Sequence, residues 1–277
     1  MRNELRHKIT GGERGIELIA WLSGKTGLSR NAAKRLIDAR QVFVNNQRIW
    51  MARHVLETGD LVEIHGLAAS SAPVATSIEV IWKDDVYLII NKPPGLLSNG
   101  PGSAENMLSE QLKRPVHAVH RLDRDTSGCM MLAWTIKDRE KMIPLFQRRE
   151  VNKIYEGLVV GKIPPGLESI NRSIDGEEAL TLIKVLQRQG ASSRVEFTLV
   201  TGRTHQIRRH LQSHGLHLAG EKNYGKTVID NPALRGLRRH MLHAKMISFP
   251  HPVTGKRIQV RAALPEDFKA AAKALGL

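Results

Sequence analysis

The stretch HRLDRDTSG, residues 120–128, decides how this sequence is interpreted. It is a polar loop between apolar, strand-like segments, and it interleaves two carboxylates with two arginines. A carboxylate held beside an arginine stays ionised and can act as a nucleophile, so Asp123 is a candidate catalytic residue. An ion-paired surface loop would have the same composition, and the pair Asp123 and Asp125 also raises a remote hydrolase hypothesis.

The segments on either side of this loop supply two candidate basic residues. Residues 86–95, VYLIINKPPG, are typical of a strand that ends in a Pro-Pro-Gly turn, with Lys92 near its end. Residues 201–211, TGRTHQIRRHL, predict a helix that Thr204 caps. Arg208 would lie beside the inward face of that helix and reach into a cleft.

The charge of the 277-residue chain is strongly positive and unevenly distributed. Its 42 Lys and Arg against 27 Asp and Glu give a formal charge of +15, and residues 203–261 hold 12 basic and 2 acidic side chains, a net of +10. Such an excess predicts a polyanionic partner, for which nucleic acid is the first candidate. Aromatic residues make up only 4%, which argues against binding that relies mainly on base stacking.

Several classes of site are disfavoured by the residues present. The single cysteine, Cys129, excludes an intrachain disulfide and a cysteine-based zinc site. Four histidines are spaced too loosely to predict a metal, namely His205, His210, His214 and His217. The chain has no apolar run long enough to cross a bilayer and no secretory signal, so we expect no membrane partner and a cytoplasmic location. No glycine-rich nucleotide-binding motif is present, so we expect no cofactor.

Composition divides the chain into two domains. Residues 67–77, LAASSAPVATS, are small, uncharged and interrupted by proline, which is typical of a flexible linker. We therefore expect an N-terminal domain over 1–66 and a second domain over 78–277. Helical and strand-like patterns occur in both, so the sequence predicts an α+β chain that begins with a small α/β domain.

Residues of about 78–265 resemble the RluA-type pseudouridine synthases. The motif at 120–128 carries the resemblance most specifically, and VNKIYEGLVVG at 151–161, TGRTHQIRRHL at 201–211 and HMLHAKMISFPHPVTGKRIQV at 240–260 follow in the family's order. The resemblance implies a catalytic domain of the pseudouridine synthase fold, with a mixed, largely antiparallel sheet flanked by helices and loops.

The resemblance also implies an isomerase, which converts specific uridines in RNA to pseudouridine after flipping the base out of its stack. Asp123 would be the catalytic aspartate, acting as a nucleophile or as the base of an elimination. Tyr155 would stack on the target base and assist proton transfer, and Arg208 would pair with Asp123 and hold it charged. A catalytically silent RNA-binding or ribosome-assembly factor is the alternative function.

Further residues are implied to contact RNA. Arg121 would fill the space left by the extruded base, and Leu218 would pack near that base. Lys92, Arg203 and Arg209 would contact phosphates. The expected partner is RNA, namely large-subunit ribosomal RNA with transfer RNA as the alternative, and we expect the chain to be a monomer.

Two departures from the family's pattern bear on substrate details. The family usually has Gly-Asp where this chain has Gly220-Glu221, close to Tyr224 in the sequence. After NKPPGLL the family often continues Val-His-Pro, whereas residues 98–101 of this chain are Ser-Asn-Gly-Pro. Neither departure changes the implied catalytic residues.

Residues of about 14–66 resemble the ribosomal-protein S-four RNA-binding domain. The stretches LSRNAAKRLIDARQVFVNNQRI and LETGDLVEI carry this resemblance. In the helix predicted over 30–40, Arg30, Lys34 and Arg35 form a basic face. The family's RNA contacts cluster on this second helix, so the three residues are implied to bind RNA, with a merely solvated helix face as the alternative.

Overall fold

The computed structural model describes residues 5–26, 30–38, 41–45, 47–49, 51–64, 77–225 and 232–277. The chain divides into two compact units, residues 1–74 and 75–277. The linker expected over 67–77 lies almost entirely outside the described residues.

The first unit is a four-stranded antiparallel sheet with two helices. The strands lie in the order β1 (Leu5–Lys8), β4 (Leu61–Ile64), β2 (Val42–Val44) and β3 (Gln47–Arg48). The helices α1 (Leu18–Thr26) and α2 (Arg30–Asp38) lie between β1 and β2 in the chain. The core of this unit is fully buried and apolar, and it includes Leu18, Leu22, Ile37, Val62 and Ile64.

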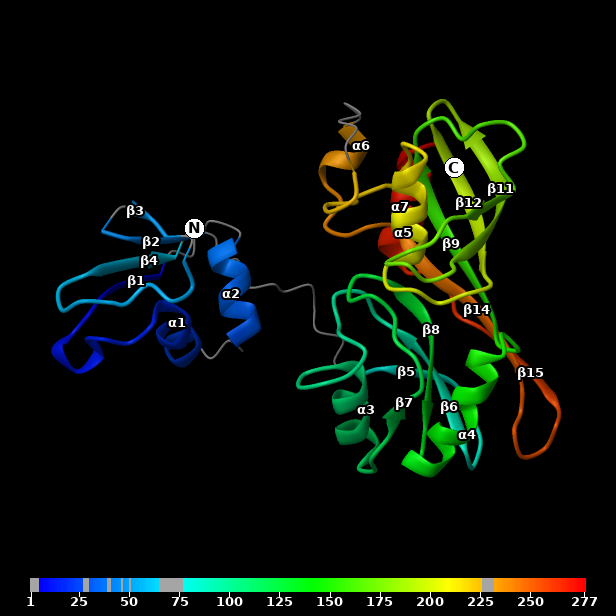
Figure 1. Cartoon of the computed structure of the whole chain (residues 1–277), viewed down its shortest axis with the longest axis horizontal. Coiled ribbons are helices and arrows are strands. Elements are labelled where there is room, and N and C mark those ends of the chain that lie inside the picture. Colours follow the sequence, from blue (N-terminus) through cyan, green and yellow to red (C-terminus); the bar gives the residue numbers. More distant parts are fainter. Residues whose placement is uncertain are drawn as a thin grey trace. The chain divides into compact units, whose positions relative to one another are not determined.

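The second unit is built on an eleven-stranded mixed sheet (Figure 1). Its main path is β10 (Ser169–Asn171), β11 (Leu180–Gln189), β12 (Ser192–Leu199), β9 (Asn152–Val160), β14 (Leu242–Pro250), β8 (Ser127–Ala133), β6 (Tyr87–Lys92) and β5 (Glu79–Lys83). Three further strands pair with it: β7 (His117–Ala118) with β8, β13 (His217–Leu218) with β9, and β15 (Arg257–Arg261) with β14. Among these strands β14 and β8 pair in parallel and the other pairs are antiparallel, which confirms the mixed, largely antiparallel sheet.

Helices lie at both ends of this sheet. Figure 1 shows α3 (Ala104–Leu112) and α4 (Ile136–Gln147) beside the β5–β8 end, and α5 (Gln206–Ser213) and α7 (Glu266–Ala274) beside β9. A short helix, α6 (Pro232–Arg235), precedes β14. Helices α3 and α4 begin at side-chain caps, since Ser103 and Thr135 each accept a hydrogen bond from the backbone N–H three residues later.

Strands β6 and β8 form the most deeply buried part of the sheet. All seven residues of β8 are buried, and β6 is buried at every position but one. The sequences of both strands are mostly continuous apolar runs and do not alternate between apolar and polar residues, because both faces of the strands are covered. The loop that connects β7 to β8 is therefore anchored on the core of the unit.

Candidate active site

The start of β8 contacts β14, and the residue before β8 contacts the segment that leads into β14. Gly128 has φ 109° and passes so close to β14 that a Cβ atom there would lie 2.3 Å from the carbonyl oxygen of Ala244, so only glycine fits. Thr126 Oγ1 lies 2.9 Å from His240 Nε2, and both residues are buried. Burial, together with the nearby charge of Arg208, lowers the pKa of His240 to about 4, so this imidazole is neutral at pH 7.

The residues on both sides of Asp123 are held through their backbone. The buried Ser98 hydroxyl donates to the carbonyl of Leu122 at 2.8 Å and accepts from the N–H of Leu122 at 2.9 Å. Lys92 Nζ donates to the carbonyl of Arg124 at 3.1 Å. The segment that follows β6 therefore fixes the loop immediately before and after Asp123.

Lys92 itself is a structural residue. Its side chain is fully buried, and its ammonium also donates to the carbonyls of Pro93 and Leu96, each at 2.8 Å. Burial lowers its pKa to about 7. The structure contradicts the expectation that Lys92 contacts phosphate, because three backbone carbonyls enclose the ammonium and no part of it reaches the surface.

Arg208 of α5 joins two carboxylates from distant parts of the chain. Its Nε and Nη2 donate to the two carboxylate oxygens of Glu221, each at 2.8 Å, and its Nη1 donates to Asp123 Oδ2 at 3.1 Å. The side chains of Arg208 and Glu221 are 6% and 1% exposed, whereas that of Asp123 is 24% exposed. The bidentate contact with Glu221 fixes the guanidinium plane, and Nη1 is thereby directed at the accessible carboxylate of Asp123.

The pKa values of this pair favour ionisation. Burial alone would raise the pKa of Glu221, but hydrogen bonds from Arg208 and from the backbone N–H of Asn223 lower it to about 2. Burial alone would lower the pKa of Arg208, but hydrogen bonds to Glu221 and Asp123 raise it above its ordinary value. At neutral pH a permanently charged guanidinium therefore faces Asp123.

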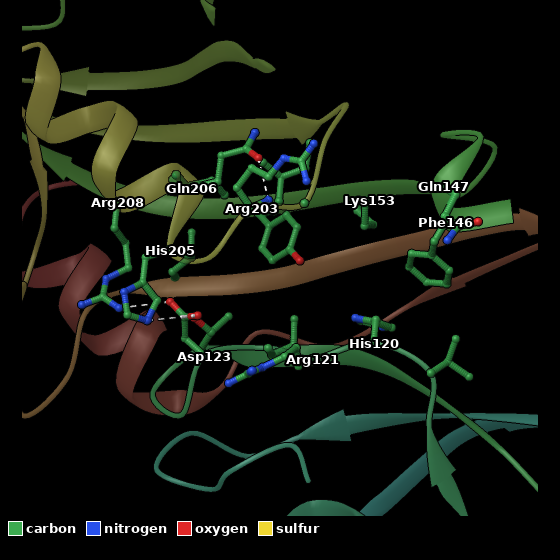
Figure 2. Close-up of a pocket in the computed structure, with 18 of the residues that line it drawn as sticks. His120, Arg121, Asp123, Phe146, Gln147, Lys153, Arg203, His205, Gln206 and Arg208 are labelled. Carbon is green, nitrogen blue, oxygen red and sulfur yellow. Dashed lines mark hydrogen bonds and ion pairs between the residues drawn. The ribbon is translucent and has the colours of Figure 1, made fainter. Parts of the chain in front are cut away.

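Helix α5 begins differently from the sequence prediction. The N-cap residue is His205, which has φ 55° and makes no side-chain capping hydrogen bond, so the expectation that Thr204 caps the helix is wrong. This left-handed turn brings the His205 ring to the site, where Nδ1 lies 2.8 Å from the hydroxyl of Tyr224 and Nε2 lies 3.7 Å from Asp123 Oδ1. Figure 2 shows both His205 and Arg208 directed towards Asp123.

A cavity of about 290 Å³ opens beside Asp123 (Figure 2). Arg121 lines it from the loop, Tyr155 from β9, Arg203 from the segment before α5, and Leu242 from β14. Burial, and next the charge of Asp123, raises the pKa of Tyr155, so its hydroxyl stays protonated. Ligand pockets usually measure ~300–1,000 Å³, so this cavity lies at the small end of that range and can hold a group the size of a nucleobase.

Two expected RNA-contacting residues lie away from the cavity. Arg209 projects from α5 and makes two hydrogen bonds, of 2.7 and 2.8 Å, with the exposed carboxylate of Asp175. Leu218 is fully buried in β13, paired with Val159, and does not line the cavity. Leu242, and not Leu218, lines the cavity, and the packing of Leu218 near the base stays a prediction.

The three basic residues of the first unit that are implied to bind RNA belong to α2. Arg30 and Lys34 are exposed there. Arg35 belongs to the same helix, but its side chain lies outside the part that the structure describes.

Two residues of the site were not identified from the sequence. Glu221 carries a signal that could have found it, because residues 203–261 contain only two acidic side chains, Glu221 and Asp230, among twelve basic ones. Lys153 lines the cavity, and it stands two residues before Tyr155 on β9, so the two side chains share one face of the strand. Strand alternation could have placed both in the same site.

The described residues contain no group of three or more His, Cys, Asp or Glu suited to a metal ion. None of the described helices combines the length and apolar character that crossing a bilayer requires.

Comparison with known proteins places this site in a family. The family model described as RNA pseudouridylate synthase matches residues 86–213. The ribosomal large subunit pseudouridine synthase D of Yersinia pestis is 31% identical over 274 residues, covering 87% of this chain and 84% of that protein. The protein of the same name from Pseudomonas aeruginosa is 34% identical over 224 residues, 69% of each chain. The solved structure of human RNA pseudouridylate synthase domain containing 4 matches with a TM-score of 0.62 and 25% identity, covering 72% of this chain and 93% of that one. The chain therefore belongs to the RNA pseudouridine synthase family and is an isomerase.

Proposed function

We propose that this enzyme converts uridines of large-subunit ribosomal RNA to pseudouridine, with Asp123 as the reacting carboxylate. The observation that carries the proposal is an accessible carboxylate at the edge of a base-sized cavity, paired with an immobilised Arg208. Relatives named for action on the large ribosomal subunit support this class of RNA. The net charge of +10 over residues 203–261 supports a polyanionic substrate.

The reaction exchanges one bond for another within a single nucleotide. The C1′–N1 glycosidic bond breaks, the uracil turns, and C5 bonds to C1′, while C5 loses a proton and N1 gains one. Asp123 assists either by attacking the ribose or by taking a ribose proton in an elimination. Tyr155, on the cavity wall, packs against the base and assists the proton transfer.

The target uridine must first leave its stack, at a cost of a few kcal/mol. Arg121, at the cavity, occupies the vacated space, and Arg203 contacts a phosphate. Arg209 is bound to Asp175 only by an exposed ion pair, which contributes little to stability, so its guanidinium can exchange that carboxylate for a phosphate. Basic side chains around the cavity thereby offset the cost of unstacking.

The first unit provides an accessory RNA contact of the S-four type. Arg30, Lys34 and Arg35 on α2 are the residues that bind, and exposure of the first two supports this role. Replacing Arg30 and Lys34 together by alanine should raise KM and flatten the salt dependence of RNA binding without changing kcat. An unchanged KM and salt dependence would remove the first unit from RNA recognition.

Tritium release from RNA labelled at uridine C5 tests the proposal. Wild type should release tritium from large-subunit ribosomal RNA of cells lacking the gene, and Asp123→Asn should release none. Asp125→Asn is the matched control, because Asp125 shares the loop but does not line the cavity, and it should keep most of the activity. Release by Asp123→Asn, or no release by wild type from any cellular RNA, would overturn the proposal.

Mapping the pseudouridines that disappear when the gene is deleted identifies the target. Losses in large-subunit ribosomal RNA are expected. Losses confined to transfer RNA would leave the chemistry intact and replace the substrate. A cell that keeps every pseudouridine would favour a catalytically silent RNA-binding factor.

A further inference from the structure

Lys153 places a largely buried ammonium on the wall of the active-site cavity. It lies on β9 on the same face as Tyr155 and lines the cavity that Asp123 borders. Its Nζ lies 3.5 Å from the carbonyl oxygen of Thr201 and 5.8 Å from the centre of the Phe146 ring. Figure 2 shows Lys153 between Arg203 and Phe146 along this wall.

The ammonium of Lys153 has fewer hydrogen-bond partners than those of Lys92 and Lys245, two other buried or partly buried lysines of the unit. An ammonium has three donors, yet within the described residues Nζ of Lys153 has one long hydrogen bond and no carboxylate within 4 Å. Lys92, by contrast, donates to three carbonyls, and Lys245 pairs with Glu156 and Glu196. A buried charge without a partner is costly, so its place in a cavity indicates a ligand that supplies the missing acceptor.

We propose that Lys153 stabilises the negative charge that develops on the uracil oxygens as the glycosidic bond breaks. The inference rests on the proposed function and deepens it. When the C1′–N1 bond breaks, its electron pair moves onto the base, which becomes an anion with charge on O2 and O4. Asp123 compensates at the ribose, either by bonding to C1′ or by removing a ribose proton. The base returns to neutrality when C5 donates its electron pair to C1′, while the carboxylate of Asp123 leaves C1′ or returns the proton to the ribose.

The position of Lys153 suits the base better than the ribose. Asp123 is held at the α5 side of the cavity by Arg208, while Lys153 lies beside Phe146 of α4. An ammonium in a partly dry cavity acts on charge far more strongly than one in water. The contact gains strength only as the base becomes anionic, so it accelerates the reaction rather than tightening substrate binding.

This role predicts a characteristic dependence on pH. Burial lowers the pKa of Lys153 to about 8, so the free enzyme loses this charge in mildly alkaline solution. The titratable groups that face the same cavity come from the loop, from β9 and from the segment around the start of α5, and they are His120, Arg121, Asp123, Tyr155, Arg203, His205 and Arg208. His120 is neutral at pH 7, because burial and the charge of Lys153 lower its pKa to about 4, and burial keeps Tyr155 protonated.

Kinetics of Lys153→Met and Lys153→Arg test the proposal. Removing one preorganised donor to a developing anion costs ~100-fold or more in kcat, so Lys153→Met should lose about that factor while KM and RNA affinity stay within about threefold. Lys153→Arg should regain most of the rate, and the alkaline fall of kcat/KM near pH 8 should disappear, because a guanidinium does not titrate there. Lys184→Met is the matched control, since Lys184 is an exposed lysine on β11, two strands from β9 in the sheet, and its loss removes the same charge.

Three results would overturn the role of Lys153. The first is a kcat for Lys153→Met within threefold of wild type. The second is a change in that variant that is confined to KM, which would make Lys153 a phosphate contact. The third is a fall of kcat/KM near pH 8 that persists unchanged in Lys153→Arg. Circular dichroism and thermal unfolding identify a variant that fails to fold, and Lys153→Arg then decides alone. The assay uses an RNA on which wild type releases tritium and Asp123→Asn does not, so failure of this inference differs from failure of the proposed function.

Discussion

Replacing Glu221 by glutamine should both destabilise the second unit and slow catalysis. The carboxylate of Glu221 accepts two hydrogen bonds from Arg208 at 2.8 Å, and its Oε1 also accepts the backbone N–H groups of Lys222 and Asn223 at 3.0 Å each. Glutamine removes the negative charge and presents an amide N–H to a guanidinium that can only donate. Arg208 would then be a buried cation paired only with Asp123.

The size of the effect follows from the lowered pKa of Glu221 and from the usual cost of breaking a buried ion pair. The fall in the pKa of Glu221 from 4.5 to about 2 corresponds to about 3 kcal/mol in favour of the ionised form. Breaking a buried ion pair from one side costs ~3–5 kcal/mol in other proteins, which agrees with that figure. We expect Glu221→Gln to lose about 3 kcal/mol of unfolding free energy, and to lower kcat at least ~10-fold because Arg208 no longer holds Asp123 in place.

Urea unfolding at pH 7 and tritium release at saturating RNA measure the two effects. Glu221→Asp is the matched control, because it keeps the charge and restores the residue usual in the family, and it should lose less than half as much stability. A loss below about 1 kcal/mol for Glu221→Gln would refute the reasoning. Equal losses for the glutamine and aspartate variants would show that side-chain length, rather than charge, is what Arg208 requires.

Three further substitutions test how the loop is held. Ser98→Val removes the hydroxyl that satisfies both backbone groups of the buried Leu122, so unfolding in urea should show a loss of about 2 kcal/mol in unfolding free energy. Ser98→Thr should largely restore that stability, and a valine variant as stable as wild type would contradict this. His240 stays neutral when folded, so the unfolded chain takes up its proton first as pH falls, and the stability present above pH 6.5 should decline by up to about 3 kcal/mol as pH falls to about 4. His240→Gln should weaken that decline between pH 7 and 5, and parallel curves for both proteins would exclude His240 as its source. Gly128→Ala should lower unfolding free energy by at least ~3 kcal/mol, because its Cβ would overlap the carbonyl of Ala244, and an unchanged melting temperature would contradict the close approach.

The motifs anticipated which residues meet but not how deeply each lies. Asp123 and Arg208 are 85 residues apart in sequence and lie in contact, as the resemblance implied. Lys92 was expected at the surface because sequence records its charge and not the three carbonyls that surround it. Leu218 was expected near the base from the resemblance alone, because β13 has two residues, too few for alternation to show which side faces the cavity.

The role of Glu221 was also hidden, for a different reason. It drew attention as a departure from the family's usual aspartate, which does not reveal that its partner is Arg208, 13 residues earlier in the chain. The start of α5 was missed because His205 adopts a left-handed conformation that is uncommon outside glycine and asparagine. Periodicity predicts regular elements, whereas these contacts depend on irregular backbone.

The attachment of the loop around Asp123 has a consequence for how the enzyme uses its affinity for RNA. Ser98, Lys92 and Thr126 fix this loop through contacts within the protein chain, so the entropy of ordering the carboxylate is lost during folding and not when substrate arrives. Under the proposed function, contacts with the RNA backbone are then free to drive extraction of the uridine. Substitutions in this loop should therefore appear first as lower protein stability and a lower turnover rate, with the dissociation constant for RNA almost unchanged.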